Sequence, residues 1–199
     1  MSDIAHLGPV ELLTPKAEES LRFFVDVLGM EIEHQEGQSV YLRGWGDYQP
    51  WSTKLTESDT SGMALLGIRA WDQEALERRV KKIEATGLGE GWTDGDRGRG
   101  PSYRFRDPDG HVFEIYYESE RYSPPPHLKP SLKNQPQRYV PRGCAVKRID
   151  HVNLLAADVY ANRVFGVDTL GYRLYERIEL NDGSEAGAWM SATIAAHEL

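Results

Sequence analysis

An internal repeat constrains this chain of 199 residues more than any other feature. Segment 9–31 can be laid over segment 151–173 without a gap. The residue types that recur in the second segment are those of Val10, Leu12, Leu13, Phe23, Val25, Asp26, Leu28 and Gly29. Sustained self-similarity of this kind indicates a duplicated structural unit. The repeat therefore predicts that the chain contains copies of one folding unit.

The first round of the hydrophobic pattern predicts a strand, a helix and three further strands. Thr14 followed by Pro15 predicts where the helix begins, and Gly29 predicts where it ends. The apolar stripe of the helix consists of Leu21, Phe24, Val25 and Leu28. The predicted strands cover residues 8–13, 30–34, 39–43 and 51–55.

A second round follows at residues 63–117 and has the same order of elements. After a strand at 63–70, Asp72 can cap a helix that Gly87 ends. The last two predicted strands cover 103–106 and 111–117 and are joined by a turn at 107–110. These patterns predict an α+β fold built from tandem βαβββ modules.

Proline-rich sequence breaks both periodicities and predicts a surface linker at residues 121–147. The predicted domains are therefore an N-terminal pair of modules at 1–120 and the start of a C-terminal domain at 148–199. The counterparts of Met63 and Glu114 in the next module would lie beyond Leu199. We therefore expect the C-terminal domain to be incomplete in these residues.

The stretch 148–155 opens the C-terminal domain and is predicted to form a short strand. His151 and Asn153 stand two residues apart, which puts them on one face of a strand. A lone strand histidine is more often structural than a metal ligand, and the residues alone leave both readings open. The repeat places Pro9 opposite His151, so the first module lacks the imidazole.

Composition and charge exclude several classes of function. The net charge of -8 argues against binding nucleic acid through a basic surface. No apolar run is long enough to span a bilayer, and the N-terminus has no signal-peptide pattern. Cys144 is the single cysteine, which fits a reducing compartment. The sequence therefore predicts a cytoplasmic protein that binds neither membranes nor nucleic acid.

The residues that end each helix and close each module resemble those of a known superfamily. The helix end at 23–30 and the closing strand with its turn at 107–115 are similar to the modules of the vicinal-oxygen-chelate superfamily. Within it, Asp150-His151 and the spacing from Trp189 to His197 and Glu198 resemble the type I extradiol ring-cleavage dioxygenases. That family includes catechol 2,3-dioxygenases and homoprotocatechuate 2,3-dioxygenases. The resemblance implies the fold of the glyoxalase, bleomycin-resistance and dihydroxybiphenyl-dioxygenase proteins.

The resemblance also implies a reaction and roles for four residues. Such enzymes cleave a catecholic ring with Fe(II) and dioxygen, in the degradation of aromatic compounds, and are usually homo-oligomers. Two histidines and one carboxylate hold the metal and leave positions open for both substrates. His151 matches the first metal ligand, and His197 matches the acid/base group. Asn153 and Trp189 match residues of the substrate pocket.

Alternatives to this interpretation remain open. The choice between Fe and Mn is open, as is the catechol that serves as substrate. Glu114 occupies the module position at which the family has its metal-binding carboxylate. Its partner position on the first strand is occupied by Pro9, which cannot bind a metal, so a structural role is favoured for Glu114. Because the other ligands would lie beyond Leu199, we expect the 199 residues alone to be inactive. Other chemistry of the superfamily, such as a glyoxalase or epimerase, and non-catalytic binding of an aromatic ligand are the rival functions.

Overall fold

The structure is a computed structural model that describes residues 2–193, 198 and 199. Its contacts divide the chain into two compact units. The linker unit consists of residues 9–64 and 119–149, and the site unit consists of residues 1–8, 65–118 and 150–199. Each unit therefore combines segments that are distant in sequence. The domain limits predicted from the sequence stay a prediction.

The linker unit contains the first module, as the hydrophobic pattern predicts. Its strands lie in the order β2-β3-β4-β1, with β1 parallel to β4 and the other neighbours antiparallel. The elements are β1 (Ile4–Thr14), α1 (Ala17–Arg22), the π-helix η1 (Phe23–Val27), β2 (Glu31–Glu36), β3 (Ser39–Arg43) and β4 (Thr53–Glu57). The predicted helical stripe packs on a buried cluster of Met30, Leu42 and Leu55. The α-helix begins at Ala17, later than Thr14 predicted, with no side-chain cap at Lys16.

Residues 119–149 lie on the first module and contain little regular structure. The only helix in this range is the short 3-10 helix η2 (Pro126–Leu128). Tyr139 stacks on Trp45 with ring centroids 4.3 Å apart, and the Lys147 ammonium lies 5.5 Å from the Trp45 ring. Aromatic and cation–π contacts, together with hydrogen bonds such as that from the Trp45 indole to the Ala145 carbonyl at 2.8 Å, hold this proline-rich segment to the first module.

The site unit contains the second module, apart from the first residues of its first strand. Its elements are β5 (Gly62–Ala70), α2 (Gln73–Thr86), β6 (Gly89–Thr93), β7 (Ser102–Arg106) and β8 (Val112–Tyr116), with strand order β5-β8-β7-β6. The Asp72 carboxylate accepts a hydrogen bond of 2.7 Å from the Ala75 amide, and Gly87 adopts a left-handed φ of 76°. Both predicted ends of this helix are confirmed. β6 was not individually predicted because Gly89 and Gly91 weaken its strand pattern.

The third copy of the module reproduces the first at the level of single backbone hydrogen bonds. It consists of α3 (Val159–Val164), the π-helix η3 (Phe165–Leu170), β9 (Arg173–Glu179) and β10 (Glu185–Ser191). The helix changes from α to π at Phe23 in the first copy and at Phe165 in the third, which are equivalent positions of the repeat. The Met30 amide donates to Phe24, and the equivalent Tyr172 amide donates to Gly166, each at 3.0 Å. The repeat in the sequence is therefore a repeat in structure.

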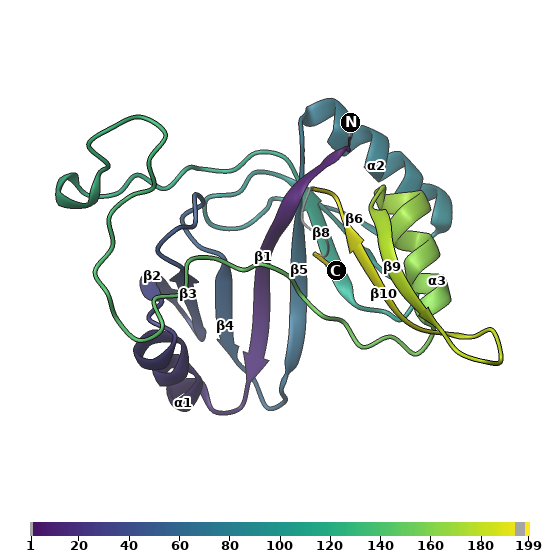
Figure 1. The fold of residues 1–199 in the computed structure, drawn as a ribbon, viewed down its shortest axis with the longest axis horizontal. Helices are drawn as coiled ribbons and strands as arrows, with labels where there is room; N and C mark the ends of the chain where they lie inside the picture. The colour runs from purple at the N-terminus through teal and green to yellow at the C-terminus, as the bar shows by residue number, and fades with distance from the viewer. Residues whose placement is uncertain (1, 194–197) are drawn as a thin grey trace. The chain divides into compact units, whose positions relative to one another are not determined.

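Helix α2 lies beside η3, the continuation of α3, in the site unit. Figure 1 shows α2 and α3 in this part of the molecule. The Arg79 guanidinium donates to the Thr169 carbonyl at 2.9 Å, and the Lys82 ammonium donates to the Asp168 carbonyl at 2.9 Å. These side chains satisfy carbonyl groups in the last turn of η3 that have no partner inside the helix. Two cations near a helix C-terminus also oppose its negative dipole end.

The strand predicted at 148–155 is wrong, because these residues form irregular backbone. Burial nevertheless alternates along them: His151, Asn153 and Leu155 are exposed and the residues between them are half-buried. A strand requires a neighbouring ladder, and the described residues place none beside this segment. One backbone bond, from the Val152 amide to the Glu198 carbonyl at 3.0 Å, ties it to the C-terminal residues.

Candidate functional site

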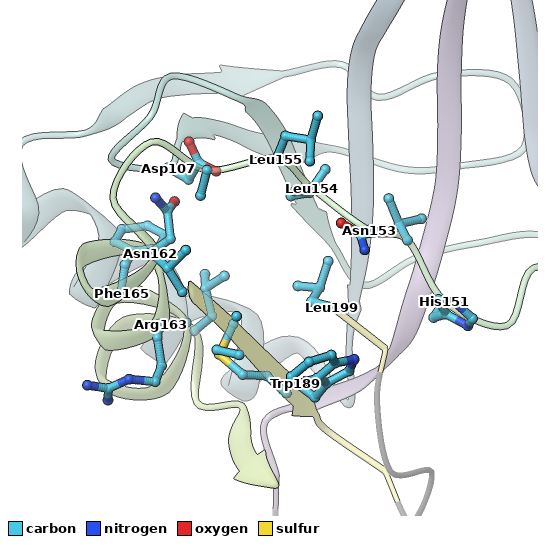
Figure 2. Close-up of a pocket in the computed structure, with 18 of the residues that line it drawn as sticks. Asp107, His151, Asn153, Leu154, Leu155, Asn162, Arg163, Phe165, Trp189 and Leu199 are labelled. Carbon is cyan, nitrogen blue, oxygen red and sulfur yellow. The ribbon is translucent and has the colours of Figure 1, made fainter. Parts of the chain in front are cut away.

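A cavity of about 390 Å³ lies within the site unit, between the irregular segment 151–156, the α3–η3 helix and β10 (Figure 2). Its apolar wall includes Phe113, Leu154, Val159, Phe165, Leu170 and Met190. Its polar wall includes Asp107, His151, Asn153, Asn162, Arg163 and Trp189. A mostly apolar cavity with a few polar groups suits a small aromatic ligand.

Three of the four residues singled out in the sequence border this cavity. His151, Asn153 and Trp189 all line it, although Trp189 lies far along the chain from the other two. In Figure 2 the Asn153 amide lies between His151 and Leu154 on the irregular segment. The fourth residue, His197, lies outside the described residues. The roles assigned to the four residues stay predictions.

The side chain of His151 is half accessible to solvent. Its Nδ1 lies 3.1 Å from Oδ2 of the adjacent Asp150, whose own side chain is also exposed. A carboxylate beside one ring nitrogen favours the tautomer that has its proton on that nitrogen. That arrangement leaves Nε2 as the basic nitrogen of the imidazole.

Trp189 reaches the cavity because β10 is irregular at this point. β10 pairs with β9 antiparallel, and the register shifts between Trp189 and Met190. Consecutive residues of a regular strand point to opposite faces, whereas an irregularity can turn both toward one side. Both residues line the cavity. The ring of Trp189 also lies over Gly187, where an added Cβ would meet it at 3.4 Å.

Glu198 follows the acid/base candidate in sequence and is buried. Its carboxylate accepts hydrogen bonds of 2.8 Å from the Ala192 amide and from the Thr193 hydroxyl. Its carbonyl accepts the bond from Val152. Glu198 therefore connects the end of β10 with the segment that carries His151.

An ion pair at the cavity wall was not predicted from the sequence. Arg163 on α3 donates to both carboxylate oxygens of Glu185, at 2.7 and 2.8 Å, and Arg177 also donates to this carboxylate at 3.0 Å. The hydrogen bonds from Arg163, with the charges of Arg163 and Arg177, lower the pKa of Glu185, and the same pairing raises the pKa of Arg163. The two partners are separated by more than 20 positions, so no local pattern could have indicated the pair.

Asp107 also lines the cavity, although the sequence predicted only a turn. Its Oδ1 accepts from the amides of Asp109 and His111 at 3.0 and 2.8 Å. Its Oδ2 lies 2.6 Å from the His111 ring. The buried carboxylate therefore orders the turn between β7 and β8, and the predicted turn is confirmed. A carboxylate that accepts this many bonds from its own turn is structural in the first place.

Glu114, the module counterpart of a metal carboxylate, is held by two arginines. Arg104 donates to its Oε1 at 2.7 Å, and a nitrogen of buried Arg99 lies 3.7 Å from its Oε2. A buried carboxylate paired with two guanidinium groups is a structural ion pair. The structural role favoured from the sequence agrees with these contacts.

The described residues do not by themselves fit a metal centre. Within residues 2–193 and 198–199, no three side chains of His, Cys, Asp or Glu gather closely enough to hold an ion. His151 has the Asp150 carboxylate beside it, but among the described residues the two belong to no group of three such side chains. None of the described helices has the length and apolar character needed to cross a lipid bilayer.

The module architecture and the cavity define a class of protein that sequence comparison identifies directly. Residues 4–115 match the Glyoxalase/Bleomycin resistance protein/Dioxygenase superfamily. The chain belongs to this superfamily. The fold predicted from the sequence resemblance is thereby confirmed.

Individual relatives include dioxygenases from bacteria. The chain is 45% identical over 197 residues to a metapyrocatechase of Geobacillus stearothermophilus, covering 99% of this chain and 60% of that protein. It is 34% identical over 200 residues to a manganese-dependent 2,3-dihydroxybiphenyl 1,2-dioxygenase of Geobacillus genomosp. 3, covering 100% of this chain and 63% of that protein. The chain thus spans less than two thirds of the length of these relatives.

Among solved structures, the fold is similar to that of the 2,3-dioxygenase LapB from Pseudomonas sp. KL28. The TM-score is 0.87 at 25% identity, over 100% of this chain and 69% of the other. Homoprotocatechuate 2,3-dioxygenase from Brevibacterium fuscum has a TM-score of 0.79 at 24% identity, over 99% of this chain and 59% of the other. The second likeness is one of fold alone.

Proposed function

We propose that the chain takes part in extradiol ring cleavage of a catecholic substrate with dioxygen. One observation carries the proposal: His151, Asn153 and Trp189, which the family resemblance selects, line a single cavity. The 45% identity to a metapyrocatechase supports it independently of that geometry. The cavity is also large enough to enclose a ring of catechol size.

Each of the four residues has a distinct task in this proposal. His151 contributes one imidazole ligand to a metal ion, and the adjacent Asp150 carboxylate fixes its tautomer. Trp189 and Asn153 form the wall against which the aromatic ring lies, by stacking and by hydrogen bonding. His197 moves protons, because an imidazole with an ordinary pKa near ~6.5 can both accept and donate them at neutral pH.

The proposed cofactor is Fe(II), and Mn(II) is the alternative because one relative is named as manganese-dependent. A divalent ion held at such a site would supply Lewis-acid and redox chemistry for a reaction between the chelating catechol and dioxygen. The described residues supply one imidazole toward it rather than a full ligand set. The proposal includes a homo-oligomeric, cytoplasmic enzyme that binds neither membranes nor nucleic acid.

The test is a ring-cleavage assay on the protein as its gene encodes it, with these 199 residues intact. We expect a yellow ring-fission product from catechol after anaerobic loading with Fe(II) or Mn(II). His151→Ala should abolish the product and lower the bound metal, whereas His127→Ala, an exposed histidine of the linker, should change neither. The 199-residue chain, assayed alongside, is expected to make no product.

Two results would contradict the proposal. Full activity in His151→Ala would remove this residue from the metal site. Saturable binding of an aromatic ligand without any metal, and with no product under any loading, would favour the binding-protein function instead. The apolar wall of the cavity is the feature that makes this second function worth measuring.

A further inference from the structure

One exposed carboxylate in the second module collects three hydrogen bonds from the start of the third. Oδ2 of Asp109, in the turn between β7 and β8, accepts from the Ala157 amide at 2.6 Å and from the Asp158 amide at 3.4 Å. It also accepts from the side-chain amide of Asn162 at 3.0 Å. Two of the donors lie directly after the irregular segment 151–156, and the third lies in the first turn of α3.

In the first module, the acceptor near the start of the helix is a side chain of the same module. There the Thr14 hydroxyl accepts from the Lys16 amide at 3.1 Å and bonds to the Ser20 hydroxyl at 2.8 Å. Lys16 and Ser20 are the repeat counterparts of Asp158 and Asn162. The same two positions thus supply the hydrogen-bond partners in both modules.

The acceptor is what differs between the two copies. The counterpart of Thr14 in the third module is Ala156, which has no hydroxyl. The counterpart of Pro15 is Ala157, so the third module has one additional amide that needs an acceptor. The Asp109 carboxylate takes the place of the missing hydroxyl and accepts from the added amide as well. A charged acceptor forms stronger bonds than a hydroxyl does.

This substitution matters because segment 151–156 has no strand ladder in the described residues. Near its start the segment is tied by the bond from Val152 to Glu198. At its other end it is tied by Asp109. In the first module, by contrast, the equivalent residues belong to β1 and pair with β4.

We infer that Asp109 is a positioning residue: its carboxylate anchors the segment that carries His151 and Asn153 and so sets the wall of the cavity. The anchoring itself depends only on the contacts above. Its consequence for catalysis rests on the proposed function. Asp107 and Asp109, two residues apart in one turn, therefore have separate tasks, since Asp107 orders the turn and Asp109 holds a neighbouring segment.

Hydrogen exchange in the 199-residue chain tests the anchoring directly. We expect Asp109→Ala to speed exchange of the amides at 152–158 by about tenfold, which corresponds to loss of a charge-assisted hydrogen bond. Asp109→Asn, which keeps one acceptor oxygen, should have a smaller effect. Asp59→Ala, which removes an exposed carboxylate from another loop, should leave exchange at 152–158 within about twofold of the wild type.

A rescue variant separates this role from general destabilisation. Adding Ala156→Thr to Asp109→Ala recreates the arrangement of Thr14 and should slow exchange at 158 again, while 157 stays fast because its added amide has no counterpart in the first module. Exchange in Asp109→Ala equal to that of Asp59→Ala would overturn the inference. Should Asp109→Ala fail to fold, the same comparison is made with Asp109→Asn, for which unchanged exchange is the refuting result.

The ring-cleavage assay then tests the catalytic consequence. In the protein as its gene encodes it, Asp109→Ala should lower kcat by about tenfold, and Asp59→Ala should not. If the wild type makes no product while exchange responds to Asp109, the proposed function is wrong and the anchoring stands. If exchange does not respond, the anchoring is wrong whatever the assay gives.

Discussion

The repeat places two glycines, Gly29 and Gly171, at equivalent helix ends, and their replacement by alanine should have unequal effects. Both residues adopt left-handed backbone angles, with φ of 77° and 83°. An alanine there costs about 1–2 kcal/mol from backbone strain alone. Gly87 has a φ of 76° and nothing within 4 Å of an added Cβ, so Gly87→Ala measures that cost by itself.

The surroundings of the two glycines determine the rest of the effect. A Cβ on Gly29 would overlap the backbone carbonyl of Arg142. The segment 142–146 would have to move, and it donates four hydrogen bonds to the helix end, from the Arg142 side chain and from the amides of Cys144 and Val146. At about 1 kcal/mol for each bond, and with the strain included, Gly29→Ala should lower the free energy of unfolding by about 5–6 kcal/mol.

Gly171→Ala should cost less because its neighbour can move. A Cβ on Gly171 would lie 2.7 Å from the guanidinium of Arg79, the far end of a flexible side chain. Shifting it sacrifices the bond from Arg79 to Thr169 at 2.9 Å. Strain plus one hydrogen bond gives about 2–3 kcal/mol for Gly171→Ala.

Urea unfolding followed by circular dichroism measures the three variants beside the wild type. The expected order of destabilisation is Gly29→Ala, then Gly171→Ala, then Gly87→Ala. Trypsin provides a second measurement, because only Gly29→Ala should speed cleavage after Arg142. A Gly29→Ala variant no less stable than Gly87→Ala would refute the argument that segment 142–146 braces the helix end.

Three further predictions concern the packing of the site unit. Pairing with Arg163 lowers the pKa of Glu185 from 4.5, so the ion pair stabilises the fold above that pH and loses this effect on acidification. The urea midpoints of the wild type and Glu185→Gln should therefore converge as the pH falls, and a constant difference would contradict this. Tyr172→Phe should stabilise the protein by about 1 kcal/mol, because the buried Tyr172 hydroxyl has no hydrogen-bond partner among the described residues. Burial also raises the pKa of this hydroxyl. A loss of thermal stability in Tyr172→Phe would be the contrary result. Phe165→Ala should lower the free energy of unfolding by about 3–5 kcal/mol, since the ring is buried and its centroid lies 6.0 Å from that of Phe105. A decrease under about 1 kcal/mol in denaturant unfolding would show that this ring does not hold η3 in place.

Two local signals in the sequence predicted their structures correctly, and in both the partners lie within about one turn of chain. Asp72 caps a helix whose first amides are three residues away, and Gly87 ends it with a positive φ. The turn at 107–110 is likewise held by Asp107 acting on amides two and four residues later. Such contacts form whatever the rest of the chain does, so the pattern of residue types is sufficient to predict them.

Sequence reasoning was wrong where a structure depends on a distant partner. The residues at 148–155 have the composition of a strand, yet a strand forms only beside another strand. The segment is instead held at its two ends, by Glu198 and by Asp109. Likewise, the pairing of Arg163 with Glu185 at the cavity wall had no local signal, because the two residues meet only when α3 and β10 pack together.

The sequence alone determined that this protein repeats one module. The structure adds that both helices change from α to π geometry at equivalent positions of the repeat. Backbone geometry follows the local residue types, and these recur between segments 9–31 and 151–173. Only the tertiary structure decided which groups bind the backbone amides at the helix start of each copy and which groups cover the glycine at its helix end. The Thr14 hydroxyl accepts from the Lys16 amide in one copy, and the Asp109 carboxylate accepts from the equivalent Asp158 amide in the other. The backbone of Arg142 covers one glycine, and the side chain of Arg79 covers the other. The physical reason is that the first amides of a helix have no acceptor inside the helix, and a duplicated sequence can find that acceptor in different parts of the fold.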